Sequence, residues 1–302
     1  MSWQGKPTAR LREELAAWRL LTPAVLLLLV FLVAPFVMSV VLSFTNQRLV
    51  SPLPTRFVGV RNYARLFGDA DFWKALRNTI LFAAVVVPVQ SGLALFLATL
   101  VNKRLPGTNF FRGIYFMPVV IPMVVVCVVW YFLLMYPEGL LNTFVQIISL
   151  GRAGPYDWLR NPSLALPTIM LVSIWQGVGF QMIIYLAGLQ NIPQELYEAA
   201  RIDGASPWAQ FLHVTMPGLR NTHIFVLVTT TILAFKLFTQ VEVLTQGGPL
   251  GATNTLVRYI YSVGYRELKV GYASAASVIF VLIVLFISLI QRRLLREERE
   301  VS

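Results

Sequence analysis

Charged residues are scarce in this chain of 302 residues: Asp, Glu, Lys and Arg make up only 13%, about half the share of a soluble domain. The single cysteine, Cys127, lies inside an apolar run, which excludes disulfides and cysteine-ligated zinc sites. Of the two histidines, His213 and His223, neither has a carboxylate or thiolate at metal-ligand spacing. The G-x-x-x-x-G-K-[ST] phosphate-binding motif and any convincing Ser/His/Asp grouping are also missing. The sequence therefore predicts neither a nucleotide site nor a catalytic centre.

Apolar residues, in contrast, make up 57% of the chain, in several runs longer than about 18 residues, the length that predicts a helix across a membrane. We therefore predict an all-α polytopic membrane protein with six transmembrane helices. The first run is too long for a secretory signal and lacks a small-residue cleavage site, so we expect it to be retained. The expected spans are residues 20–44, 78–101, 113–135, 164–189, 222–244 and 271–291, between tails at 1–19 and 292–302.

The formal net charge of +11 would suggest nucleic acid as a partner of a soluble chain. Here basic loops against anionic lipid headgroups explain it more simply, and no basic-aromatic stretch suggests a nucleic-acid surface. The tails and connections on the side of both termini hold about 13 Lys and Arg residues, against about 11 on the opposite side. The positive-inside preference thus favours cytoplasmic termini only slightly, because residues 45–77 carry most of the opposing charge.

A polar stretch of helical character lies between the fourth and fifth expected spans, at residues 193–217; we name it the EAA segment after residues 198–200. Pro193 suits the first position of a helix, where its missing N–H costs nothing. Glu195 and Glu198 follow in the first turns, where the helix dipole favours negative charge. Gly204 is expected to take the left-handed conformation that ends the helix.

A second helix is predicted directly after this turn, with Ser206 as its N-cap and Pro207 as its first residue. Pro217 is expected to end it. Ala199 and Ala200 share a face of the first helix, and small residues between acidic flanks let another protein approach closely. From the residues alone, a solvated surface loop explains this segment equally well.

The order Glu198-Ala199-Ala200, three residues, Gly204, nine residues and VTMP closely resembles the EAA loop of ABC-importer permeases, which reads EAA, three residues, G, nine residues, I-x-L-P. Val for Ile and Met for Leu are apolar replacements. In that family the loop forms a cytoplasmic coupling helix that docks into a groove on the ATPase subunit. The residues to which the resemblance assigns ATPase coupling are Glu198, Ala199, Ala200, Asp203, Gly204 and Pro217.

Glu198 has two interpretations. The resemblance implies an ion pair with a basic residue of the ATPase, whereas the alternative is a pair within the helix, with Arg201.

The resemblance extends almost from end to end, since FVGVRNYARLF, RGIYFMPVVIPMVVVCVVW, LTQGGPLGATNTLVRYIY and VGYASAASV look like blocks of carbohydrate-uptake permeases of the maltose type. It implies the MetI-like permease fold of type I importers, in the plasma (inner) membrane of a prokaryote, with both termini cytoplasmic. The chain would then be a transport subunit rather than an enzyme, in contact with membrane lipid and not with nucleic acid.

The implied complex contains a second homologous permease, two ATPase subunits and an extracytoplasmic sugar-binding protein. ATP and Mg would be bound by the ATPase, and this chain would hold no cofactor. The implied solute is a mono- or oligosaccharide, with a glycerol-phosphate-type solute as the alternative. A secondary transporter driven by an ion gradient would need inverted repeats and carboxylates near the midplane, and only Glu242 comes near a span interior.

A solute pathway needs polar or aromatic groups on one stripe of a span, because sugar hydroxyls that leave water need new hydrogen bonds. Counted from Glu198, part of the fourth span resembles the place where maltose-type permeases hold their sugar, and part of the fifth span forms the matching stripe. The expected pathway residues are Ser173, Gln176, Gly177, Phe180, Thr230, Leu233, Ala234, Lys236 and Leu237. Ordinary helix packing explains each position as well, since several of them are small or apolar.

Lys236 is a special case, because a charge inside a span costs about 2.5–3.5 kcal/mol on insertion scales. It has four interpretations: contact with the solute, an ion pair with Glu242, an ion pair with the partner permease, or an extended side chain that reaches the membrane surface.

Overall fold

The computed structural model describes residues 7–51, 54–102 and 107–295, which form two compact units. Unit 1 takes its described residues from Met1–Gly68 and Ser262–Ile279, and unit 2 from Asp69–Tyr261 and Phe280–Ser302. The last helix, α15 (Val270–Leu295), contributes residues 270–279 to unit 1 and the rest to unit 2. In the described part of the chain, the ordered elements are helices and a single antiparallel bridge between Thr45 and Phe57, which confirms the all-α prediction.

Unit 1 begins with a long apolar helix that includes α1 (Pro7–Leu28), the π-helical turn η1 (Leu29–Val33) and α2 (Ala34–Ser43). Pro35 lies directly after the π-helical turn. A proline cannot donate to the carbonyl four residues earlier, and its ring would clash with it. Here that carbonyl belongs to Phe31, inside η1, and the wider turn accommodates the proline without ending the helix.

The remaining described elements of unit 1 lie at the C-terminal end of this helix, where α3 (Arg61–Phe67) and η3 (Ser262–Arg266) accompany the start of α15. The Asn62 amide donates to the carbonyls of Ser43 and Thr45, both at 2.8 Å. The Tyr63 hydroxyl lies 2.6 Å from the Ser43 hydroxyl. These bonds satisfy the carbonyls at the end of α2, which have no helical partner.

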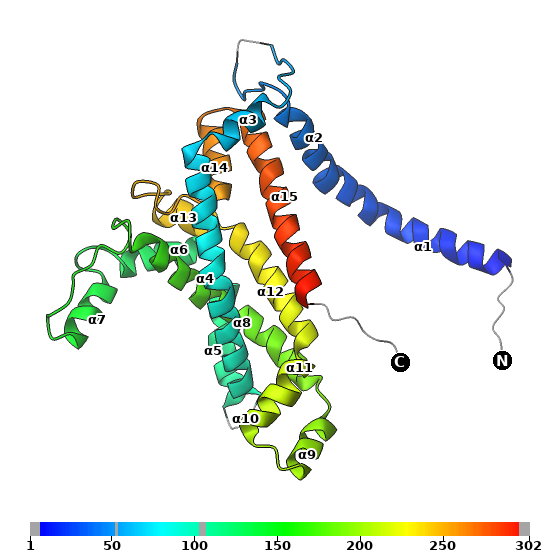
Figure 1. Ribbon diagram of the computed structural model, residues 1–302, viewed down its shortest axis with the longest axis vertical. Coiled ribbons are helices and arrows are strands. Elements are labelled where there is room, and N and C mark those ends of the chain that lie inside the picture. Colours follow the sequence, from blue (N-terminus) through cyan, green and yellow to red (C-terminus); the bar gives the residue numbers. More distant parts are fainter. Residues whose placement is uncertain (1–6, 52–53, 103–106, 296–302) are drawn as a thin grey trace. The chain divides into compact units, whose positions relative to one another are not determined.

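Unit 2 is a bundle whose central helices are α4 (Ala70–Val101), α8 (Ala165–Gln190) and α12 (Arg220–Phe235) (Figure 1). The others are α5 (Thr108–Val120), α6 (Met123–Leu133), α7 (Leu140–Ile148), α9 (Gln194–Ile202), α10 (Pro207–Gln210), η2 (Phe211–Thr215), α11 (Met216–Gly218), α13 (Thr239–Leu244) and α14 (Leu256–Tyr261). Helix α8 packs against α4, α5 and α12, so it holds the bundle together.

Two clusters of buried apolar side chains stabilise unit 2. The first joins α4, α6, α8 and α13, with Ile169, Val172 and Val241 fully buried at its centre. The second joins α4, α8 and the start of α12 around Met182 and Leu219. The ends of α8 are therefore anchored by separate clusters, one toward residues 165–172 and one toward residues 182–189.

The third expected span is not one straight helix. Helix α5 ends at Val120, α6 begins at Met123, and the two are bent by 98°. Ile121 and Pro122 have extended backbones, with ψ of 130° and 133°. The ring of Pro122 disfavours the helical conformation for the preceding residue, and here the helix ends at that residue. We expected the span over residues 113–135 to be broken at Pro118 and Pro122; the break occurs at Pro122, whereas Pro118 lies inside α5.

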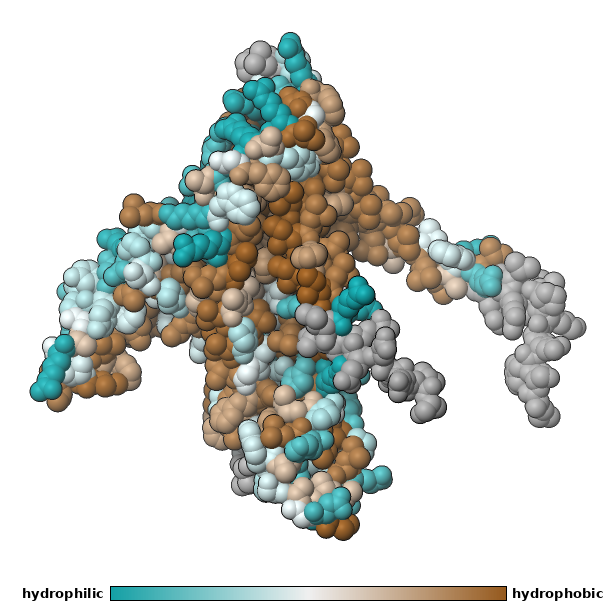
Figure 2. Space-filling model, in the orientation of Figure 1, coloured by the Kyte–Doolittle hydropathy of each residue, from teal (hydrophilic) through white to brown (hydrophobic). Residues whose placement is uncertain are grey.

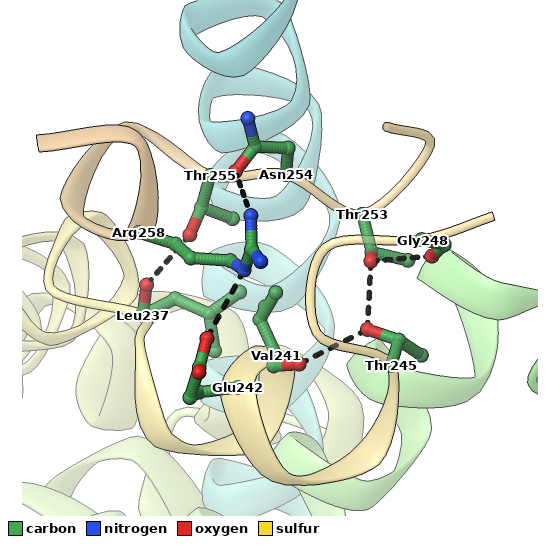
Figure 3. A network of polar contacts seen from close by, with 9 residues as sticks. All are labelled: Leu237, Val241, Glu242, Thr245, Gly248, Thr253, Asn254, Thr255 and Arg258. Atoms are coloured by element: carbon green, nitrogen blue, oxygen red, sulfur yellow. Dashed lines mark hydrogen bonds and ion pairs between the residues drawn. The ribbon is translucent and has the colours of Figure 1, made fainter. Parts of the chain in front are cut away.

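The fifth expected span is interrupted as well. Helix α12 ends at Phe235 with Lys236 as its C-cap, and α13 begins at Thr239. This break leaves the Leu237 carbonyl outside the helical pattern, and the Thr255 hydroxyl donates to it at 2.8 Å (Figure 3). A side chain of the polar loop after α13 therefore supplies the hydrogen bond that this carbonyl lacks because the helix is interrupted.

Among the described residues, five helices are long and apolar enough to cross a membrane, or six if the bent pair counts as one span. The single helices are Glu14–Ser43, Ala70–Val101, Ala165–Gln190, Arg220–Leu244 and Val270–Arg293. Figure 2 shows apolar side chains over the long helices and hydrophilic side chains gathered on the connections. This distribution is that of a polytopic membrane protein.

Candidate functional site

The EAA segment forms a helix, a tight turn and a second helix at the end of unit 2 where α8 stops and α12 begins (Figure 1). Gly204 has φ of +77°, as predicted for the left-handed turn. The Ala205 N–H donates to the Ala200 carbonyl at 2.8 Å, and the Gly204 N–H donates to the Arg201 carbonyl at 3.0 Å. This pair of bonds is the Schellman motif, which fixes the direction in which the chain leaves α9.

The two prolines at the ends of the EAA segment, Pro193 and Pro217, do not lie where the sequence predicted relative to the helix ends. Pro193 is the N-cap of α9 and has an extended backbone, so the helix begins one residue later, at Gln194. Pro217 lies inside α11, which ends one residue later, at Gly218; the carbonyl four residues before the proline, that of His213, lies in the π-helical turn η2. Ser206 is the N-cap of α10, and its side chain accepts a hydrogen bond from the Ala209 N–H at 3.2 Å.

Helix α9 has no buried residue. Glu198 and Ala199 are exposed, Ala200 is half-buried, and Asp203 is the exposed C-cap. Large apolar side chains stand beside them in solvent, with Ile202 87% and Trp208 66% exposed. Exposed apolar groups next to charged ones are typical of a surface that another protein covers.

Glu198 forms no ion pair with Arg201 or with any other basic side chain that the structure describes. The intrahelical alternative for Glu198 is therefore absent from this conformation. The carboxylate stands free to meet a cation from outside the chain.

One side of α9 is fixed to the bundle. The Tyr197 hydroxyl lies 3.0 Å from the Thr215 hydroxyl, and its ring packs on the second apolar cluster. Ile192, just before α9, and Leu219, just before α12, are buried in the same cluster. These contacts join α9 to the end of α8 and to the start of α12.

The expected pathway residues fall into three groups by exposure. Phe180, Leu233 and Lys236 are exposed on the isolated chain, whereas Gln176 and Gly177 are half-buried. Ser173, Thr230, Ala234 and Leu237 are buried within unit 2. In this conformation the buried four therefore pack against the chain's own helices, and the exposed three are available to a solute or a partner.

The buried polar residues of this region bond to one another. The Gln181 amide donates to the Thr230 hydroxyl, and the Gln240 amide donates to the Ser173 hydroxyl at 3.4 Å. The Gln176 amide reaches the Pro118 carbonyl on α5 at 3.5 Å. Gln240 and the buried Gln90 of α4 were not predicted, because sequence spacing does not show which helices meet.

Two glycines let helices approach α8 closely. A Cβ atom at Gly179 would collide with the Tyr115 carbonyl of α5, and one at Gly177 would collide with the Gln90 amide. Only the Gly179 contact is with backbone; the contact at Gly177 is with the end of the Gln90 side chain, which can move, so close packing between α8 and α5 depends on Gly179.

Lys236 stands at the C-cap of α12, where its N–H bonds the carbonyls of Ile232 and Leu233. Its expected pairing with Glu242 does not occur in this conformation. The Glu242 carboxylate instead accepts from the Arg258 guanidinium at 3.1 Å, and the same guanidinium donates to Asn254 at 3.1 Å (Figure 3). Glu242 thus serves to hold the loop after α13 to α14.

The histidines have packing partners. His223 Nδ1 lies 3.0 Å from the Tyr185 hydroxyl, and His213 Nδ1 lies 2.9 Å from the Ala209 carbonyl. Within the part of the chain that the structure describes, no group of three or more His, Cys, Asp or Glu residues is placed to hold a metal ion.

A family model described as "Binding-protein-dependent transport system inner membrane component" matches residues 90–300. The chain is 35% identical over 290 residues to the lactose transport system permease protein LacF of Rhizobium radiobacter, covering 95% of this chain and 96% of the relative. It is 33% identical over 290 residues to the trehalose/maltose transport system permease protein MalF of Thermococcus litoralis, covering 96% of each.

A solved structure has the same fold. It is the crystal structure of a bacterial alginate ABC transporter in complex with an alginate pentasaccharide-bound periplasmic protein. One of its chains superposes with a TM-score of 0.83 at 22% identity, covering 97% of this chain and 98% of that chain. At this identity the likeness concerns the fold alone.

Proposed function

This chain belongs to the family of binding-protein-dependent transport system inner membrane components, and from that premise we propose that it imports a saccharide as half of a heterodimeric pore. It is an ABC-transporter permease subunit with the MetI-like fold, not an enzyme. ATP and Mg are bound by a separate ATPase. The saccharide is proposed because relatives that match nearly the whole chain are named for lactose and for trehalose/maltose transport.

The observation that best supports coupling to the ATPase through the EAA segment is the exposure of α9. Its Glu198 is unpaired among the described residues, its apolar neighbours are in solvent, and a Schellman turn fixes its exit. We propose that two ATPase subunits dock here and on the equivalent helix of a second, homologous permease. This requires the EAA segment in the cytoplasm, and an even number of spans then places both termini there too.

The contacts of the EAA segment suggest how ATP would open the pathway. Closure of the two ATPase subunits moves the docked α9 helices, and the buried side chains of Ile192 and Leu219 transmit this motion to α8 and α12. Because ATP binds preferentially to one arrangement, it shifts a two-state equilibrium between closed and open pathways. The solute, delivered by an extracytoplasmic binding protein, would then meet Phe180, Leu233 and Lys236, which are exposed on these helices.

Reconstitution tests this assignment. The complete complex, in lipid vesicles with its binding protein, should show ATP-dependent uptake of at least one saccharide from a panel of lactose, trehalose, maltotriose and glucose. The same saccharide should stimulate ATP hydrolysis. Uptake of sn-glycerol 3-phosphate and of none of the sugars would instead favour the glycerol-phosphate alternative, and it would overturn the saccharide proposal.

Lys236 is expected to contact the solute, since it is an exposed cation at the break in the fifth span. Its structural alternative is to stabilise the carbonyl end of α12. A hydrogen bond to a charged group contributes about 1.5–3 kcal/mol, so Lys236→Met should raise the solute concentration for half-maximal uptake roughly tenfold or more. Lys236→Arg should recover part of this. An unchanged half-maximal concentration in Lys236→Met would contradict solute contact and leave an ion pair with the partner permease, a side chain that reaches the membrane surface, or the stabilising role.

A further inference from the structure

A cavity of about 480 Å³ lies in unit 2, and neither the EAA segment nor any of the expected pathway residues lines it. It is formed by the end of α6, the loop before α8 and the loop after α13. The polar and aromatic residues among its walls are Tyr131, Tyr136, Asp157, Arg160, Thr245 and Gln246. Sites for small molecules have volumes of about 300–1,000 Å³, so this cavity is large enough for one.

The chain order places the cavity at the opposite end of the spans from the EAA segment. Arg160 lies just before the start of α8, and α8 ends just before the EAA segment. The 26 residues of α8 extend about 39 Å, enough to cross a bilayer. With the EAA segment in the cytoplasm, as proposed, the cavity faces the side from which the binding protein delivers solute.

The polar groups around the cavity are of two kinds. Some are paired within the chain: in the wall, the Thr245 hydroxyl lies 2.7 Å from the Thr253 hydroxyl, and the Asp157 carboxylate accepts from the Arg160 N–H at 3.0 Å. Behind the wall, Glu242 is bound by Arg258 (Figure 3). The other polar side chains of the wall are unpaired within the described part of the chain. Among the described residues, the side chains of Tyr131, Tyr136, Arg160 and Gln246 have no hydrogen-bond or ion-pair partner. Unpaired donors and acceptors around a cavity are available to a ligand.

The backbone holds one of these groups in a costly conformation. Gln246 has φ of +50°, in the left-handed region that residues other than glycine rarely adopt. The hydrogen bonds of the loop impose this conformation, since the Gly248 N–H donates to the Thr245 carbonyl at 2.9 Å and the Thr253 hydroxyl donates to the Gly248 carbonyl at 2.7 Å. Strained residues that the surroundings hold in place are concentrated at ligand sites.

We propose that this cavity binds the saccharide at the outer mouth of the permease, before it enters the membrane pathway. Tyrosine rings cover the apolar faces of sugar rings, and the amide, guanidinium and carboxylate groups bond sugar hydroxyls. Asp157 and Arg160 have opposite charges, which favours a neutral saccharide over an anion. This inference rests on the proposed function, because it takes the solute to be a saccharide.

Binding to the permease complex without its binding protein tests the proposal. Radiolabelled lactose, trehalose and maltotriose serve as probes on the complex of both permeases and ATPase in lipid nanodiscs. At least one should bind, and Arg160→Ala and Tyr136→Ala should each raise its Kd about tenfold. Gln246→Gly should do the same, and because glycine adopts positive φ freely it removes the amide without disturbing the loop. Arg152→Ala, an exposed arginine of the same connection outside the cavity, is the matched control and should bind normally.

Absence of binding for all three probes, or equal affinity in the cavity variants and the wild type, would overturn the proposal. Normal sugar affinity with weakened docking of the binding protein would overturn it too, because the cavity would then receive a protein loop. Uptake by the complete system separates these results from failure of the proposed function. If the complete system takes up a probe sugar and the variants bind it normally, only the cavity site is wrong.

Discussion

Replacing Glu198 by arginine is expected to abolish solute uptake while the chain still inserts into the membrane. Glu198 is exposed on α9, has no ion pair among the described residues, and lies near exposed apolar side chains that a partner protein could cover. Loss of one member of a charge pair at an interface costs about 2–5 kcal/mol, or roughly 30-fold or more in affinity. Reversal of the charge adds repulsion, so the ATPase should no longer co-purify.

Two variants identify the cause of this loss. Glu195→Arg reverses the charge at another exposed position of the same helix, at a cost to the helix dipole of only about 0.3–1 kcal/mol, and should transport well. The double variant Glu198→Arg with Arg201→Glu keeps opposite charges at the two positions, as an intrahelical pair would require, without restoring an interface pair. Recovery of uptake in the double variant, or normal uptake in Glu198→Arg, would contradict the interface role.

Replacing Gly204 by valine is expected to uncouple ATP hydrolysis from the solute. Gly204 has φ of +77°, and an added Cβ would meet nothing within 4 Å, so the effect of the substitution is conformational and not a clash. A β-branched residue in the left-handed region costs on the order of 1–3 kcal/mol. The Schellman turn should open, and α9 would then present Glu198 in a different direction. Basal ATPase activity should persist while stimulation by the binding protein and solute is lost.

Gly204→Asn is the matched control, because asparagine adopts the left-handed conformation more readily than other residues do. The Gly204→Asn variant should keep most of the stimulation, although the asparagine side chain is about as large as that of valine. Normal solute-stimulated activity in Gly204→Val would show that the turn is not needed. Equal losses in both variants would indicate that bulk, and not backbone conformation, is responsible.

The sequence predicted best those features that depend on a few adjacent residues. The left-handed Gly204 and the Ser206 cap follow from local backbone chemistry and occur in the structure. Prolines were harder to interpret. Pro122 lies where the helix is bent by 98°, whereas Pro118, only four residues earlier, lies inside α5. Pro35 also lies in continuing helical chain, two residues after a π-helical turn. The residue type alone therefore did not indicate which proline would end a helix.

The pathway could be predicted only as far as a stripe on a helix. Residue spacing placed Ser173 and Phe180 together on α8, yet one is buried against α13 through Gln240 and the other is exposed. Which part of a stripe faces inward depends on the neighbouring helices, and these are brought together by distant parts of the chain. For the same reason the cavity near Arg160, built from three separate connections, had no signal in the sequence.

The contact of Gly179 with the Tyr115 carbonyl leaves no room for a methyl group between α8 and α5. Two backbones that touch so closely can rotate about the point of contact, but side chains on either side obstruct sliding along it. The crossing therefore acts as a fulcrum for α8. If the EAA segment faces the cytoplasm, as proposed, a tilt about this contact would move the two ends of α8 in opposite directions.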